Sequence, residues 1–296
     1  MGSVERFGQT ALMGVLSRSW SLFKASWAVL RQDKELAVLP VVSAITSLVC
    51  VAPFFGLAFL TAASGAIDSG GSEVSFGPLG YVFFFLAYLI GAYVTIFFQS
   101  ALVLAANERL SGGDPTLGWA ISEAASNAGR ILPWALISAT VSIVLQAIQE
   151  RAGFIGRIVV GMIGIAWALV TFLVLPILVI EKVGVKEALT RSAGAFKRTW
   201  GENVVGNGGI GLVTMLLMVG AVVVSLPMVL LGVSARSTPV IVAGAALMVV
   251  LMVVVSVVGA ALSGVFRTVL YRFAVLGEEP TGFTHDQIAG AFRPKR

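Results

Sequence analysis

Six long apolar stretches, separated by short polar segments, dominate the pattern of the chain. All but one are longer than the roughly 20 residues that cross a bilayer as a helix. We expect transmembrane helices over residues 36–64, 79–107, 131–149, 156–180, 204–232 and 239–266. The third is the shortest of the six. The pattern therefore predicts an all-α integral membrane protein with about six spans, organised as a single transmembrane domain over residues 1–296.

Prolines mark some of the expected helix ends and bends. Pro239 opens the sixth span, and Pro133 lies near the start of the third, where we expect its missing N–H to cost nothing. Pro53, Pro176 and Pro227 lie inside spans and predict kinks, which helix bundles tolerate because neighbouring groups satisfy the freed carbonyls.

Two polar segments, 12–34 and 185–200, carry apolar residues on one side only. Apolar positions that recur in steps of three and four form one face of a helix. In the first segment these positions are Leu12, Leu16, Trp20, Phe23, Trp27 and Leu30, and in the second they are Val185, Leu189, Phe196 and Trp200. We expect both segments to be amphipathic helices in the cytoplasmic membrane interface.

These two segments also match each other. Residues 16–27 align with 189–200 at an offset of 173 residues, with six identities in twelve positions and two exchanges of Ser for Thr. A fainter third copy covers 120–130, just before the third span. The pattern indicates pseudo-repeats of an interfacial helix followed by a helical hairpin, related by an axis along the membrane normal.

Composition supports a membrane protein. Hydrophobic residues make up 57% of the chain and charged residues only 12%, with a mean hydropathy of +0.95. Soluble domains carry roughly 25% charged residues, so no part is polar enough to be a separate soluble domain. The net charge of +5 lies beside apolar spans, which favours membrane topology over nucleic-acid binding. Cys50 is the single cysteine, so the chain forms no internal disulfide.

The distribution of Lys and Arg predicts the orientation. The N-terminal segment, the loops 108–130 and 181–203, and the tail 267–296 together hold 17, whereas the three alternate loops hold three. Cytoplasmic loops carry the excess of positive charge, so we expect both termini in the cytoplasm. The charged N-terminal segment also lacks the compact apolar core of a cleaved signal peptide.

The sequence offers little for catalysis. The single histidine, His285, lies beside Asp286 in the expected tail, where a solvated pair is the commoner outcome than a catalytic dyad. One His and one Cys cannot build an ordinary metal site. Gly206 to Gly211 matches the spacing of a dinucleotide-binding loop, but no acidic residue follows between Glu202 and Glu278. We therefore expect no enzyme, no cofactor and no metal.

Two groups of residues are candidate sites. Basic residues of the interfacial helices are candidates for contacts with anionic lipid head groups, with a purely topological role as the alternative; they are Lys24, Arg31, Arg191, Lys197 and Arg198. A polar, glycine-rich start of the fifth span is a candidate contact for a substrate or head group, with close helix packing as the alternative; it comprises Asn203, Gly206, Asn207, Gly208 and Gly209.

Other small, polar and aromatic residues receive structural interpretations. Close helix packing is expected at Gly156, Gly161, Gly164, Gly259, Ser263 and Gly264. Interfacial placement, with a pore lining as the alternative, is expected for Gln99, Asn107, Glu108, Gln146, Gln149 and Glu150. A lipid-facing or belt position is expected for Tyr81, Phe83, Phe84, Phe85, Tyr88, Phe97 and Phe98.

The residues at 19–40, SWSLFKASWAVLRQDKELAVLP, resemble the start of an uncharacterised family of bacterial and archaeal multi-pass membrane proteins. ALTRS at 188–192 and KRTWGEN at 197–203 fit the same family, and the likeness covers about residues 14–275. More distantly, the chain is similar to the membrane domain fused to some glycerophosphodiester phosphodiesterases. The resemblance implies a six-helix protein of the bacterial plasma membrane and supplies no activity.

Together these patterns favour a non-enzymatic membrane protein that acts as an assembly or lipid-associated component. The alternative is a transporter or channel for a small or lipidic solute. The expected partners are membrane lipids, with anionic head groups at the cytoplasmic face, and a second copy of the chain or another membrane protein. Nucleic acid is not an expected partner.

Overall fold

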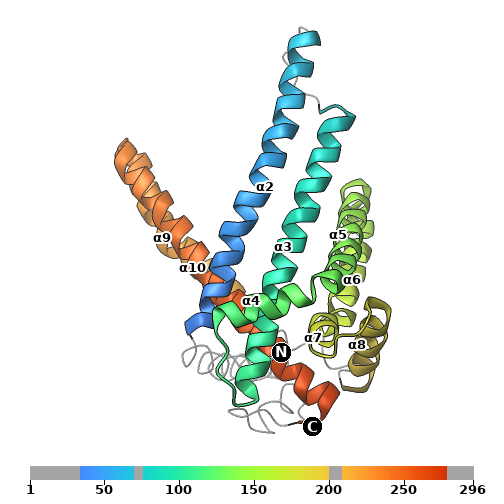
Figure 1. The fold of residues 1–296 in the computed structure, drawn as a ribbon. Coiled ribbons are helices and arrows are strands. Elements are labelled where there is room, and N and C mark those ends of the chain that lie inside the picture. The colour runs from blue at the N-terminus through green and yellow to red at the C-terminus, as the bar shows by residue number, and fades with distance from the viewer. Residues whose placement is uncertain (1–33, 70–75, 200–208, 279–296) are drawn as a thin grey trace, which may run out of the picture. The chain divides into compact units, whose positions relative to one another are not determined.

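The computed structural model describes residues 34–69, 76–199 and 209–278. Over these residues the regular elements are all helical (Figure 1). They are α2 (Lys34–Ser69), α3 (Pro78–Leu110), α4 (Leu117–Ser126), α5 (Ala128–Arg151), α6 (Phe154–Val170), α7 (Val174–Ile180), α8 (Val185–Thr199), α9 (Gly209–Ser234), α10 (Thr238–Tyr271) and the short π-helix η2 (Arg272–Leu276). The expected interfacial helix at 12–34 lies outside the described residues, apart from Lys34, which begins α2.

Six helical segments are long and apolar enough to cross a membrane, which confirms the predicted all-α class. They are Leu36–Thr61, Pro78–Leu110, Ala128–Arg151, Phe154–Ile180, Val213–Ser234 and Thr238–Leu276. In each of them, less than half of the most apolar stretch is buried inside the structure, with buried shares from 6% to 39%. Since a helix that exposes such a surface is stable only in an apolar medium, this is the expected appearance of membrane spans.

Contacts divide the chain into two compact units. One comprises Val38–Ala105 and Asp114–Gly194, and contains most of α2 and α3 together with α4 to α7 and most of α8. The other contains Ala106–Gly113 at the end of α3 and, from Ala195 onward, the hairpin of α9 and α10. Each unit is described separately below.

In the first unit, α2 and α3 run antiparallel and side by side (Figure 1). Phe55 of α2 contacts Phe84 of α3, with ring centroids 5.5 Å apart. A β-carbon added at Gly91 would lie 3.3 Å from a methyl carbon of Val51. Because the residue number falls along α2 as it rises along α3, these contacts fix the antiparallel pairing.

The third and fourth spans form the other hairpin of this unit. Thr116 caps α4, its hydroxyl accepting from the Trp119 N–H at 3.2 Å. The buried Asn127 joins α4 to α5, and its amide donates to the Glu123 carbonyl at 3.0 Å.

The helix α5 begins at Ala128, which places Pro133 in its second turn. The prediction that Pro133 costs no hydrogen bond is therefore wrong, since a residue there would ordinarily donate within the helix.

The fourth span is interrupted rather than kinked. The helix α6 ends at Val170, and α7 begins at Val174 with its residues buried through Val179. In a continuous helix the Val174 N–H would donate to the Val170 carbonyl, but here it donates to the Thr171 carbonyl at 3.1 Å. Pro176, which has no N–H, follows within one turn and disfavours a regular helix. The predicted disturbance at Pro176 is therefore present, although it takes the form of a break.

A side chain from α8 satisfies the freed carbonyl. The hydroxyl of Ser192 donates to the Val170 carbonyl oxygen at 2.5 Å. Ser192 is buried together with Ala188, one turn before it, and Ala195, one turn after it. The small side of α8 therefore packs inward, adjacent to the predicted apolar stripe, whose member Leu189 is only half-buried. Small side chains permit this close approach, and the hydrogen bond requires it.

In the second unit, α9 and α10 pack closely through glycines. A β-carbon added at Gly244 would lie 2.9 Å from the Val229 backbone nitrogen, and one added at Gly259 would lie 2.6 Å from the Thr214 methyl carbon. The predicted packing role of Gly259 is confirmed. Pro239 lies in the first turn of α10, as expected.

The sixth span extends beyond residue 266, where the sequence predicted a cytoplasmic tail. The helix α10 continues to Tyr271, and residues 268 to 271 are buried. The guanidinium of Arg272 then donates to the Ser111 hydroxyl at 2.6 Å and to the Asn107 carbonyl at 3.3 Å, and pairs with Glu278 at 2.7 Å. The helix therefore continues past the expected end of the span, because these burials and hydrogen bonds support further helical turns.

Candidate ligand-binding cavity

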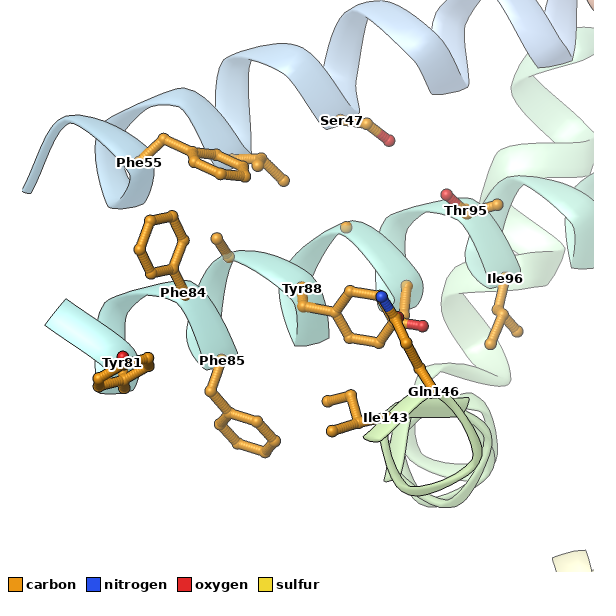
Figure 2. Close-up of a pocket in the computed structure, with 14 residues that line it drawn as sticks. Ser47, Phe55, Tyr81, Phe84, Phe85, Tyr88, Thr95, Ile96, Ile143 and Gln146 are labelled. Carbon is orange, nitrogen blue, oxygen red and sulfur yellow. The ribbon is translucent and has the colours of Figure 1, made fainter. Parts of the chain in front are cut away.

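A large apolar cavity opens between α2, α3 and α5 (Figure 2). Its volume is about 840 Å³, within the range of roughly 300–1,000 Å³ typical of ligand sites. It is lined by Ser47, Val51, Phe55, Tyr81, Phe84, Phe85, Ala87, Tyr88, Gly91, Ala92, Thr95, Ile96, Ile143 and Gln146. All of these residues belong to the first compact unit.

Aromatic packing holds α2 and α3 together at one end of the cavity. The ring of Phe84 lies edge-to-face against Phe55, and also against Phe59 and Phe76 with centroid separations of 6.3 and 4.9 Å. Such pairs contribute about 0.5–1.5 kcal/mol each beyond the apolar area that they bury. Figure 2 shows Phe55 and Phe84 facing each other across the two helices. This cluster fixes the spacing of the walls.

Small residues keep the middle of the cavity open. Ala87 lies one helical turn before Gly91 and Ala92 on α3, and none of the three has a side chain large enough to fill the space. Ala87 is buried, whereas its neighbour Tyr88 is 44% exposed. The volume therefore arises where small side chains of α3 lie between its aromatic ones.

The helix α5 closes the other end. Figure 2 shows Ile143 and Gln146 projecting from α5 toward the part of α3 that carries Tyr88 and Ile96. The Gln146 amide nitrogen donates to a Glu150 carboxylate oxygen at 3.2 Å, one turn further along the helix. This bond orients the amide and holds a carboxylate within hydrogen-bond distance of a lining residue.

None of the described lining residues carries a charge. The polar groups are the hydroxyls of Ser47, Thr95, Tyr81 and Tyr88 and the amide of Gln146. Within the described part of the chain, no three His, Cys, Asp or Glu side chains come together in a way that would hold a metal ion. The arrangement suits binding of an apolar molecule, oriented by a few polar contacts.

The sequence did not predict this cavity. Tyr81 and Tyr88 are exposed as expected, but Phe84 belongs to the aromatic cluster and Phe98 is buried at 7% exposure, so a purely lipid-facing role is wrong for these two. Gln146 was placed at the interface, with a pore lining as the alternative, and it lines the cavity. The sequence does contain one sign of the cavity: its lining residues on α3 recur in steps of three and four, which places them on one face of that helix.

The predicted basic residues fall partly outside the described residues. Lys24 and Arg31 are not among them, and of Arg198 only its place in α8 is described. Arg191 is exposed and pairs with Glu187 at 2.5 Å and with Glu181. Lys197 is exposed on the same helix. Arg191 is therefore held by two carboxylates, which leaves Lys197 as the more available cation.

The predicted glycine sites have different outcomes. Of the polar start of the fifth span, Asn203, Gly206, Asn207 and Gly208 lie outside the described residues, and Gly209 begins α9. In the fourth span, an added β-carbon at Gly161 or Gly164 would meet nothing within 4 Å, and one at Gly156 would meet only Ala152 in the preceding turn. The prediction that these three pack against another helix is wrong within the described chain, because α6 turns them away from its neighbours.

The six long apolar helices, with an apolar cavity between three of them, define a multi-pass α-helical membrane protein. More specifically, the chain belongs to a family of unknown function, DUF6159, whose pattern matches residues 78–283. The match begins at α3 and ends shortly after η2, so it does not include residues 19–40, on which the resemblance to a membrane-protein family was based. No curated protein and no solved structure matches the chain. The comparisons give no support to the expected similarity to glycerophosphodiester phosphodiesterases.

Proposed function

We propose that this chain is a non-enzymatic, lipid-associated component of the bacterial plasma membrane that holds a hydrocarbon chain in the cavity between α2, α3 and α5. The cavity carries the proposal, because its volume of about 840 Å³ is lined by uncharged, largely apolar residues of membrane-spanning helices. In a bilayer the surrounding medium is hydrocarbon. An apolar space of this size is therefore filled by lipid or a lipid-like molecule.

An empty cavity would be unfavourable. Each pair of atoms at optimal separation gains about 0.1–0.2 kcal/mol of dispersion energy, and side chains lining an empty space lose these contacts. Water is a poor replacement because it needs two to four polar partners at each position. The polar groups of the lining are few and are spread over α2, α3 and α5 among apolar neighbours, which favours an apolar occupant.

Within this proposal both termini are cytoplasmic. The support is the excess of 17 Lys and Arg on the terminal side over three on the other. The helix α8 then lies on the cytoplasmic side, with its small buried face toward the protein and its charged face outward. Lys197 and Arg198 there contact anionic head groups, each contributing roughly 1 kcal/mol of attraction. We also propose that a second copy of the chain or another membrane protein covers part of the exposed apolar spans.

A transporter of a small or lipidic solute is the second candidate. The interruption between α6 and α7 favours it, because discontinuous spans are common where transporters bind their substrates. Ser192 satisfies the freed Val170 carbonyl at this break, however, and the large cavity lies elsewhere. Flux of a fluorescent lipid across proteoliposome membranes would distinguish this candidate from a static lipid-binding role.

The lipid-binding proposal is tested by filling the cavity. Ala92 lines it, so Ala92→Phe would occupy part of the space, whereas Ala246→Phe makes the same change at an exposed position of α10. Mass spectrometry of lipid that remains after extensive detergent washing should show at least a twofold loss for Ala92→Phe alone. Equal lipid retention in both variants would refute the proposed site.

A further inference from the structure

We propose that the cavity selects an amphiphile with a positively charged ammonium head and a hydrocarbon tail. This inference rests on the proposed lipid-binding function and adds the chemical class of the ligand. It follows from the length of the cavity, the aromatic groups along it and the Glu150 carboxylate that is hydrogen-bonded to the lining residue Gln146.

The length of the cavity matches one lipid molecule. Its lining residues on α3 extend from Tyr81 to Ile96, fifteen residue steps apart. At 1.5 Å per residue this is about 22 Å, close to the roughly 20–22 Å of one leaflet including its head groups. A single hydrocarbon tail with its head group therefore fits along α3 without crossing the whole membrane.

Aromatic rings give the cavity its preference for a cation. Tyr81, Phe85 and Tyr88 line it and are 66%, 42% and 44% exposed, so their rings are accessible from the open space. The faces of aromatic rings carry negative potential and attract ammonium groups, with quaternary ammonium ligands as the best-known case. Figure 2 shows Tyr88 beside Gln146, where α5 adds its polar groups.

The only charge linked to the lining by a described hydrogen bond is negative. Gln146 donates its amide to Glu150 at 3.2 Å, so its amide oxygen remains as an acceptor for an ammonium N–H. The carboxylate of Glu150 adds attraction at short range. No described Lys or Arg lines the cavity. Arg151, the nearest in sequence, instead lines a separate groove with Val144 and Ile148. An anionic head would therefore meet no cationic side chain among the described lining residues.

The experiment measures binding to the full-length protein in maltoside micelles. The probes are radiolabelled dodecyltrimethylammonium, dodecanoate and dodecanol, which share a tail length and differ in head charge. Binding is compared with that of variants at equal micelle concentration, so partition into micelles cancels. Glu150→Gln should weaken binding of the ammonium probe by about three- to tenfold and leave the other two unchanged.

Two further variants separate charge from shape. Tyr88→Leu should weaken binding of the ammonium probe, whereas Tyr88→Phe should retain it because the aromatic face remains. Glu187→Gln, which removes an exposed carboxylate on α8 away from the cavity, should change nothing. Size-exclusion profiles check that each variant is folded. If Tyr88→Leu does not fold, the Glu150→Gln and Tyr88→Phe variants still test the inference.

A second arm identifies the source of the ligand. Lipid retained from nanodiscs that contain phosphatidylethanolamine and phosphatidylglycerol in equal amounts should be enriched in the ethanolamine lipid if a membrane aminophospholipid is the occupant. Ammonium-probe binding without that enrichment supports a soluble lipophilic amine. Equal binding of all three probes, unaffected by Glu150→Gln and Tyr88→Leu, would overturn the inference but leave lipid binding intact. Failure of every probe, with no effect of Ala92→Phe on lipid retention, would overturn both.

Discussion

The close packing of α9 against α10 makes a quantitative prediction for Gly244. A β-carbon there would lie 2.9 Å from both the backbone nitrogen and a methyl carbon of Val229, and 3.2 Å from the Met228 carbonyl carbon. Two of these three atoms belong to the backbone of α9, so a rotamer change cannot remove the overlap. Gly244→Ala must therefore separate the helices, which costs about 1–3 kcal/mol for an overpacked contact.

Helix propensity acts in the opposite direction and must be separated from packing. Replacing Gly by Ala inside a helix gains about 0.5–1 kcal/mol. Gly220→Ala supplies the matched control, since Gly220 lies in α9 of the same hairpin and a β-carbon there meets nothing within 4 Å. The propensity gain is common to both variants. The difference between them therefore isolates the packing cost, and we expect Gly244→Ala to be the less stable by about 1–3 kcal/mol.

The measurement is the free energy of unfolding in mixed micelles, by titration with dodecyl sulfate and detection of helix content. Val229→Ala in the Gly244→Ala background should recover only part of the loss, because it removes the methyl contact and leaves the backbone contact. Equal stability of the Gly244→Ala and Gly220→Ala variants would refute the close approach of α9 and α10.

Three further predictions concern α8 and the topology. Ser192→Ala should destabilise the protein by about 1–3 kcal/mol in the same titration, because it leaves the Val170 carbonyl without its described donor; no loss would show that water or another group replaces the hydroxyl. In a cysteine-free background, a cysteine at Ser69 should react with a membrane-impermeant reagent in intact cells and one at Thr284 should not, and the reverse would overturn the orientation. Replacing Lys197 and Arg198 with Gln should reduce retention of anionic lipid without altering orientation, since fifteen terminal-side charges remain; unchanged retention would leave them as topology signals.

The spans were predictable because length and hydropathy alone decide whether a helix crosses a membrane. Backbone groups in hydrocarbon must pair within their own segment, so a long apolar run has few alternatives to a helix. Helix ends were less predictable. The sixth span continued past Arg267 because residues 268–271 are buried and Arg272 finds partners at Asn107 and Ser111, more than 150 residues earlier. Contacts so distant in sequence leave no local pattern.

The break in the fourth span was only half visible in the sequence. Pro176 predicts a disturbance because it removes a hydrogen-bond donor, but a kink and a break satisfy that constraint equally well. What distinguishes them is the Ser192 hydroxyl, which supplies the Val170 carbonyl with another donor. In the sequence, Ser192 is one polar residue among several on a charged helix. Its role depends on the packing of α8, which the pattern of α6 and α7 does not specify.

The cavity was the least predictable feature, and the reason lies in the solvent. In a soluble protein, an apolar stripe on a helix indicates the core, because its other faces are polar. In a bilayer the lipid tails are as apolar as leucine, so the stripe of Tyr81, Phe84 and Tyr88 on α3 has the same composition whether it faces lipid or protein. What the sequence does contain is a change in side-chain size along that stripe, from aromatic residues to Gly91 and Ala92. A run of small residues permits close helix packing where a partner approaches, as Val51 of α2 approaches Gly91, and leaves a void where none does. The positions of α2 and α5 decide between these outcomes.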